Sequence, residues 1–185
     1  ATQASLGERL MRVLFRGGFY ACSGYGQALR DYLMALRSVE FFDFNIQSIV
    51  DSDNADPPKR YRPLFQHIQI RPLEEYTHVV VHSDHARPAP QRFINDVPDG
   101  VKKVLITTWD LDKCHPYFAQ RLQADFDLII VPSKFSMDVA VAAGVAKRKI
   151  LCIPHAFDPA WYSGKPRLNL SQNRPYMFYN IGTWT

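Results

Sequence analysis

Cysteine is scarce in this 185-residue chain, which has only Cys22, Cys114 and Cys152 and no CxxC pair. An odd number of thiols without paired spacing argues against a disulfide framework and against a zinc knuckle. The sequence also lacks any apolar run near the roughly 18 residues that a membrane-spanning helix needs. Charged residues interrupt the N-terminal segment, so we expect no signal peptide there. These absences predict a cytoplasmic protein with reduced thiols and no membrane span.

Charge of one sign is not concentrated anywhere in the chain. The formal net charge is +4 and the isoelectric point is about 9.0, yet no block of lysine and arginine occurs. The balance favours anionic ligands but is too mild to indicate nucleic-acid binding. With 46% hydrophobic and 22% charged residues and no internal repeat, the composition is that of an ordinary globular domain.

Apolar runs alternate with amphipathic segments along most of the chain. Near-continuous runs of valine, isoleucine and leucine separated by helices are typical of a parallel sheet covered on both faces. The expected fold is therefore α/β, with a Rossmann-like parallel sheet. Ser133 is expected to cap the last helix and Gly144 to end it. Strands are predicted at 11–15, 42–50, 77–82, 103–109, 127–131 and 150–153, helices at 25–39, 116–124 and 134–143, and an exposed loop at 51–63.

Four glycines lie within ten residues of one another after the first predicted strand and at the start of the first predicted helix: Gly17, Gly18, Gly24 and Gly26. The dinucleotide fingerprint G-x-G-x-x-G is matched only at its first two glycines, and the connection is about seven residues long, more than the fingerprint's short turn. Asp51 or Asp53 could supply the acidic residue that binds ribose, so an NAD-type oxidoreductase stays an alternative. A turn without any ligand is another alternative. A Walker loop is excluded, because no Gly-Lys-Ser/Thr follows.

Three histidines, His78, His82 and His85, lie in or just after the third predicted strand. A binuclear metal site would need a histidine where Val80 stands, so the metal interpretation lacks a ligand. His82 and His85 fall at the carboxyl end of a parallel strand, where open α/β sheets bind ligands. We therefore expect at least one of the two to contact a ligand.

A second polar group, Trp109, Asp110, Asp112 and His115, follows the next predicted strand. The aspartates and the histidine could form an acid/base set, or Asp112 could simply cap the following helix. Trp109 could equally be a wall of the core. We assign Trp109 and Asp110 to the cleft and the other two residues to structure.

Residues 127–158 carry the motifs DLIIVPS, a helix ending in AGV, and KILCIPHAFD. In this order they resemble the end of the N-terminal domain in GT-B glycosyltransferases of the family 4 (group 1) type. His155-Ala-Phe stands where the family usually has Asn-Gly-Val before the aspartate. The segment TTWDLDK at 107–113 is similar to a family T-x-W-E-x-D-K segment, and MFYNIG at 177–182 looks like the first strand of the family's C-terminal domain.

The resemblance implies an acceptor-side Rossmann-like domain at 1–155, an interdomain linker at 156–175, and at 176–185 the first strand of a donor-binding domain that this chain lacks. It implies a transferase that moves a sugar from a nucleotide-sugar donor to an unidentified acceptor. Retention of configuration is expected, with the donor phosphate assisting, so no catalytic residue is named. The nucleotide sugar is a co-substrate, and no cofactor or metal is implied. A non-catalytic ligand-binding module remains the alternative class.

The resemblance also implies roles for individual residues. His85 is favoured over His82 for the donor sugar, because HARPAP resembles the family's His-Glu-Pro-x-x-Pro. The residues expected on the donor or phosphate side are Gly17, Gly18, Ser23, Gly24, Gly26 and Gly182, and those expected on the sugar or acceptor side are His82, His85, Trp109 and Asp110.

Overall fold

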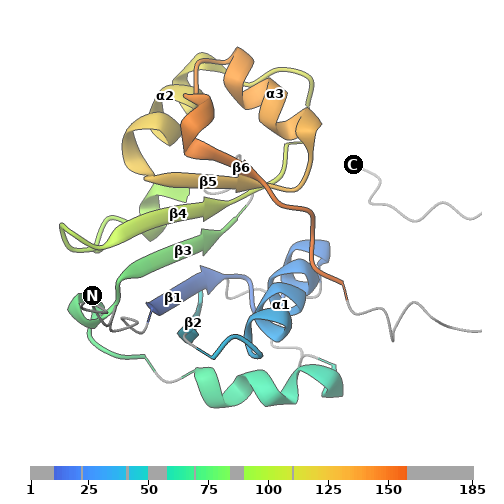
Figure 1. Ribbon diagram of the computed structural model, residues 1–185, viewed down its shortest axis with the longest axis vertical. Helices are drawn as coiled ribbons and strands as arrows, with labels where there is room; N and C mark the ends of the chain where they lie inside the picture. Colours follow the sequence, from blue (N-terminus) through green and yellow to red (C-terminus); the bar gives the residue numbers. More distant parts are fainter. Residues whose placement is uncertain are drawn as a thin grey trace, which may run out of the picture.

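The computed structural model describes residues 11–21, 23–40, 42–49, 58–68, 70–83, 90–109 and 111–157. These residues form a sheet of six parallel strands in the order β2-β1-β3-β4-β5-β6 (Figure 1). The predicted α/β fold with a Rossmann-like parallel sheet is confirmed. The strands are β1 (Met11–Gly17), β2 (Phe42–Ser48), β3 (His78–His82), β4 (Lys102–Ile106), β5 (Leu128–Val131) and β6 (Ile150–Cys152).

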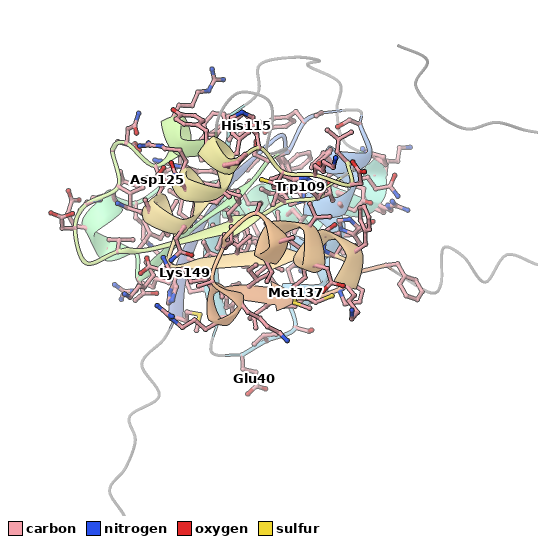
Figure 2. The ribbon with its side chains drawn as sticks, turned by 90° about the horizontal axis from the view of Figure 1, so that it is seen from above. Glu40, Trp109, His115, Asp125, Met137 and Lys149 are labelled. Carbon is pink, nitrogen blue, oxygen red and sulfur yellow. The ribbon has the colours of Figure 1, made fainter. Side chains whose placement is uncertain are left out.

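Three α-helices connect these strands: α1 (Gly24–Leu36), α2 (Pro116–Asp125) and α3 (Lys134–Ala142). As predicted, the Ser133 hydroxyl caps α3 by accepting from the Ser136 amide, and Gly144 follows the helix with a φ of 104°. Asp112 does not cap α2. Instead His115 is the N-cap and its ring nitrogen accepts from the amide of Tyr117 (Figure 2). Pro116 fixes the first helical position.

Short 3-10 helices complete the described part of the chain: η1 (Lys59–His67), η2 (Leu73–Glu75), η3 (Pro90–Phe93) and η4 (Lys147–Lys149). The prediction of an exposed loop at 51–63 is wrong from Lys59 onward, where η1 begins. Residues 51–57 lie outside the described ranges. Tyr61 and Leu64 in η1 are buried. Because side chains three residues apart share one side of a 3-10 helix, this spacing packs η1 against the core.

The two faces of the sheet are covered by different helices. Leu29 and Leu33 of α1 pack with Val13 and Phe15 on one face, whereas α2 and α3 cover Leu14 and its neighbours on the other. Figure 1 shows α1 and η1 beside β1 and β2, and α2 and α3 beside β5 and β6. Past α1, the first face continues as an apolar groove of about 410 Å³. In the described ranges, no helix is long and apolar enough to cross a membrane.

The strand order reverses at β1, which has β2 on one side and β3 on the other. The connections after β1 and β3 therefore leave the sheet toward opposite faces, and they open a crevice where such folds bind ligands. Gly17 at the end of β1 pairs with His82 at the end of β3. The topology thus brings the glycine-rich connection and His82 together at the carboxyl edge.

A buried arginine anchors this edge from the α2 side. Arg16, the residue before Gly17, is 4% exposed. Its guanidinium donates to both carboxylate oxygens of Asp96, at 2.6 and 2.8 Å, and to the Phe93 carbonyl oxygen at 2.6 Å. The hydrogen bonds from Arg16 hold the pKa of Asp96 below its ordinary value of 3.8. The pair fastens the segment after η3 to the end of β1.

Replacing Asp96 by asparagine is expected to lower the free energy of unfolding by about 2 kcal/mol near neutral pH, since a buried guanidinium loses its countercharge. This loss of stability is smaller than the loss expected when a fully buried ion pair is broken, because the Asp96 side chain is 60% exposed. The contribution is complete above the carboxyl's ordinary pKa and disappears as the pH falls through the lower folded-state value. Urea unfolding at neutral and acid pH measures it. Asp138→Asn, in the exposed Lys134–Asp138 pair, is the control and should change stability little.

Candidate functional site

A cavity of about 690 Å³ opens at the carboxyl edge of the sheet, beside the N-terminus of α1. Its walls come from three places that are distant in sequence: the first turns of α1, the residue Thr108 after β4, and the segment after β6. Mixed polar and apolar side chains in a cavity of this size are typical of a small-molecule site. The lining residues are Ser23, Gly24, Tyr25, Gln27, Ala28, Asp31, Thr108, His155, Ala156 and Phe157.

The start of α1 is suited to an anion. The Ser23 hydroxyl accepts from the Gly26 amide at 3.2 Å, which makes Ser23 the N-cap, and the first turn contains no acidic side chain. A Cβ atom added at Gly24 would meet no atom within 4 Å, so the space beside this residue is open. A helix N-terminus carries a partial positive charge and directs backbone N–H groups outward. The geometry can therefore accept a phosphate group close to the backbone.

The other glycines of the connection serve packing. A Cβ atom at Gly26 would lie 2.2 Å from the Ala21 carbonyl oxygen and 2.8 Å from that of Gly18. A Cβ atom at Gly17 would lie 2.7 Å from Leu29 and 3.1 Å from the His82 carbonyl oxygen. Of the predicted phosphate-side residues, Ser23 and Gly24 line the cavity, whereas Gly17 and Gly26 let the connection, α1 and β3 approach one another. Gly18 does not line the cavity, and its carbonyl oxygen lies beside Gly26.

Arg30 holds the connection in place from inside α1. Its side chain is 5% exposed, and its guanidinium donates to the carbonyl oxygens of Phe19 at 2.6 Å and Ala21 at 3.0 Å. Without these hydrogen bonds, the turn would bury the two carbonyl oxygens with no donor from this side chain. A lone arginine in an amphipathic helix carries no local signal for this role, so the sequence does not predict it.

His82 lies behind the cavity wall. It is 4% exposed, and the rings of Tyr25 and Tyr32 meet its ring edge-on at 5.6 and 6.2 Å between centroids. Burial, and secondarily the charge of His155, lowers the pKa of His82 from 6.5 to about 4. The imidazole is therefore neutral at physiological pH, with one nitrogen as donor and one as acceptor. His78 lies at the opposite end of β3, so the two histidines do not converge on one metal.

Two tyrosines of α1 tie the cavity walls together. Tyr25 and Thr108 share a hydrogen bond between their hydroxyl groups. The Tyr32 hydroxyl lies 3.2 Å from Nδ1 of His155 and 3.4 Å from the Pro154 carbonyl oxygen. Burial raises the pKa of Tyr32 and lowers that of His155. The segment after β6 is thereby held beside α1 at Tyr32.

Trp109 packs in the core on the α2 face, 4% exposed (Figure 2). Its indole nitrogen donates to the Lys113 carbonyl oxygen. Its neighbour Thr108, which the sequence analysis did not select, provides the cavity wall after β4 instead. His115 is occupied in capping α2. His85, Asp110 and Gly182 lie outside the described residues.

No protein-family model matches this sequence, and no curated protein matches it either. The fold, however, is similar to that of Anabaena HepE, with a TM-score of 0.54 both in the crystal structure with UDP and glucose and in that with UDP-glucose. The sequence identities are 14% and 15%, and each match covers 82% of this chain and 46% of the HepE chain. The chain thus spans about half the length of the solved chains it matches. At this identity the similarity establishes the shared fold.

Proposed function

We propose that this chain is the acceptor-side half of a GT-B glycosyltransferase that moves a sugar from a nucleotide-sugar donor to an acceptor. The observation that carries the proposal is the Ser23-capped start of α1, which opens at Gly24 onto a cavity of about 690 Å³. This cavity lies at the carboxyl edge of the sheet, beside the helix that follows β1, and open α/β sheets bind nucleotides at their carboxyl edge. The HepE complexes with UDP-glucose support a uridine nucleotide as the donor's carrier.

In this proposal the donor diphosphate lies against the first turn of α1. Because Gly24 has no side chain, the diphosphate can approach the backbone closely. The first-turn N–H groups, which have no partner within the helix, stabilise its negative charge. Gln27, Asp31 and Thr108 offer hydrogen-bonding groups that can orient sugar hydroxyls. These residues supply binding and orientation, which bring the reacting groups into the required geometry.

The cavity also fits the proposed domain organisation. His155, Ala156 and Phe157 form part of its wall, and the proposed linker begins at residue 156. A second domain joined at this position would close over the cavity and exclude water from the transfer. Transfer with retention, and the donor- or acceptor-side roles of His85, Asp110 and Gly182, belong to the same proposal and follow from the resemblance.

An NMR titration of the 185-residue chain with UDP-glucose tests the proposal. We expect weak, millimolar binding, because half of the cleft is absent, with amide shifts concentrated at Ser23, Gly24 and Thr108. Gly24→Val should abolish these shifts without unfolding the protein, since Gly24 lines the cavity and a Cβ atom added there meets no protein atom within 4 Å.

Lys134→Val is the matched control, because Lys134 is likewise the first residue of a serine-capped helix and does not line the cavity. This variant should bind as the wild type does. Shifts that avoid the start of α1, or persist in Gly24→Val, would refute the assignment. A fluorescence titration in which NADH binds more tightly than UDP-glucose would favour an oxidoreductase instead.

A further inference from the structure

A second, smaller cavity of about 250 Å³ adjoins the first one. Asp31 and Phe157 line both cavities, so the two spaces meet at these side chains. Asp31 lies seven residues after Gly24 on α1, which places it about 10 Å further along the helix. The remaining lining residues of the second cavity are Met34, Ala35, Arg60 and Tyr61.

The polar wall of this second cavity is a rigid cluster of charged and aromatic groups. Two guanidinium groups lie over the Tyr61 ring, with Cζ of Arg30 5.1 Å and Cζ of Arg60 4.4 Å from its centroid. The Tyr61 hydroxyl accepts from Arg60 and donates to Asp31 at 2.6 Å. Arg60 and Asp31 form an ion pair at 3.8 Å with side chains only 21% and 12% exposed. Ligand binding would therefore cost little ordering of these side chains.

The chemistry of this wall favours a neutral, hydroxyl-rich ligand. The guanidinium of Arg60 is a donor and the carboxylate of Asp31 an acceptor, and side by side they match neighbouring hydroxyl groups on a sugar ring. The positive charge of Arg60 and the negative charge of Asp31 offset each other, and the Asp31 carboxylate repels an anionic ligand. Met34 and the ring of Phe157, which is 65% exposed, offer apolar surface to the C–H face of such a ring.

We infer that the second cavity is a subsite for a sugar ring of the acceptor, with Asp31, Arg60 and Phe157 as its specificity-determining residues. The inference rests on the proposed function, because it assigns the larger cavity to the donor. It identifies the acceptor as a saccharide, or as a molecule that ends in one.

Saturation-transfer NMR of the 185-residue chain with methyl α-D-glucopyranoside tests the subsite. We expect transfer to the ring C–H protons, with the ring stacked on Phe157. Asp31→Asn should weaken binding about tenfold, since a hydrogen bond to the charged carboxylate is replaced by a weaker one to a neutral amide oxygen. Phe157→Ala should weaken binding by a similar factor, and because this side chain is exposed the variant should keep its fold. Tyr117→Ala removes an equally exposed aromatic ring from α2, 59% exposed, and should bind normally.

Inorganic phosphate serves as the competing probe. Stronger binding of phosphate than of the glucoside, increased further by Asp31→Asn, would overturn the subsite in favour of an anion site. The subsite is equally refuted if the glucoside does not bind, or if it binds alike to wild type, Asp31→Asn and Phe157→Ala. Shifts at Gly24 with UDP-glucose, without glucoside binding, would refute the subsite alone. Glucoside binding without those shifts would refute only the donor assignment.

Discussion

Replacing Gly26 by alanine is expected to lower the free energy of unfolding by about 3 kcal/mol, near the upper end of the range for overpacking a closed site. The added Cβ would lie 2.2 Å from the Ala21 carbonyl oxygen and 2.8 Å from that of Gly18. Both atoms belong to the backbone, and Arg30 donates a hydrogen bond to the Ala21 carbonyl oxygen. The connection therefore cannot yield without losing these hydrogen bonds.

Gly24→Ala is the matched control, because Gly24 lies in the same helical turn but has no atom within 4 Å of an added Cβ. We expect this variant to be at least as stable as the wild type, since alanine favours a helix more than glycine does. Urea unfolding of both variants gives the comparison. Equal stability of Gly26→Ala and wild type would show that α1 does not pack on the connection as closely as described.

The wild-type protein is expected to lose about 3 kcal/mol of stability through His82 alone as the pH falls from 6.5 to about 4. Burial lowers the folded-state pKa of this histidine from 6.5 to about 4. Between these values the unfolded chain binds a proton at His82 and the folded chain does not, so acidification favours unfolding. Below about pH 4 both states are protonated, and the loss stops.

His82→Gln should remove this component, because glutamine does not titrate in this range. The groups that face His82 are Tyr25, Tyr32 and His155, and of these His155 contributes the smaller part of the shift. His155→Gln should therefore keep most of the pH dependence. Free energies of unfolding measured across this range for all three proteins decide the matter. The same pH dependence in wild type and His82→Gln would contradict the burial of a neutral imidazole.

The strands and their order of appearance could be predicted because each one is a short apolar run between amphipathic segments, and such local patterns survive in the folded chain. Element ends were less predictable. The run at 103–109 continues to Trp109, but β4 ends at Ile106. The helix η1 begins at Lys59, inside the predicted loop at 51–63. In η1 the packing of Tyr61 and Leu64 against the core outweighs the local composition.

The candidate site was only partly predictable. Parallel strands present their carboxyl ends at one edge, so the glycine-rich connection and His82 could be expected to meet there. The roles of individual residues in the site could not be predicted from the sequence. Glycines that look equivalent in sequence have different surroundings in the structure: Gly24 opens onto a cavity, whereas Gly17 and Gly26 lie against carbonyl oxygens and the Leu29 side chain. Likewise, Thr108 and not Trp109 lines the cavity.

By itself, the sequence determined the α/β class and the edge of the sheet where polar and glycine residues gather, because both depend on periodicity along short segments. Only the tertiary structure decided that His82 is buried, that Arg30 holds the connection, and that Asp31, Arg60 and Tyr61 meet beside a second cavity. Asp31 and Tyr61 are separated by 30 residues in sequence but share a hydrogen bond. Contacts of this kind depend on how α1 and η1 pack together, and no local pattern in either segment encodes that packing.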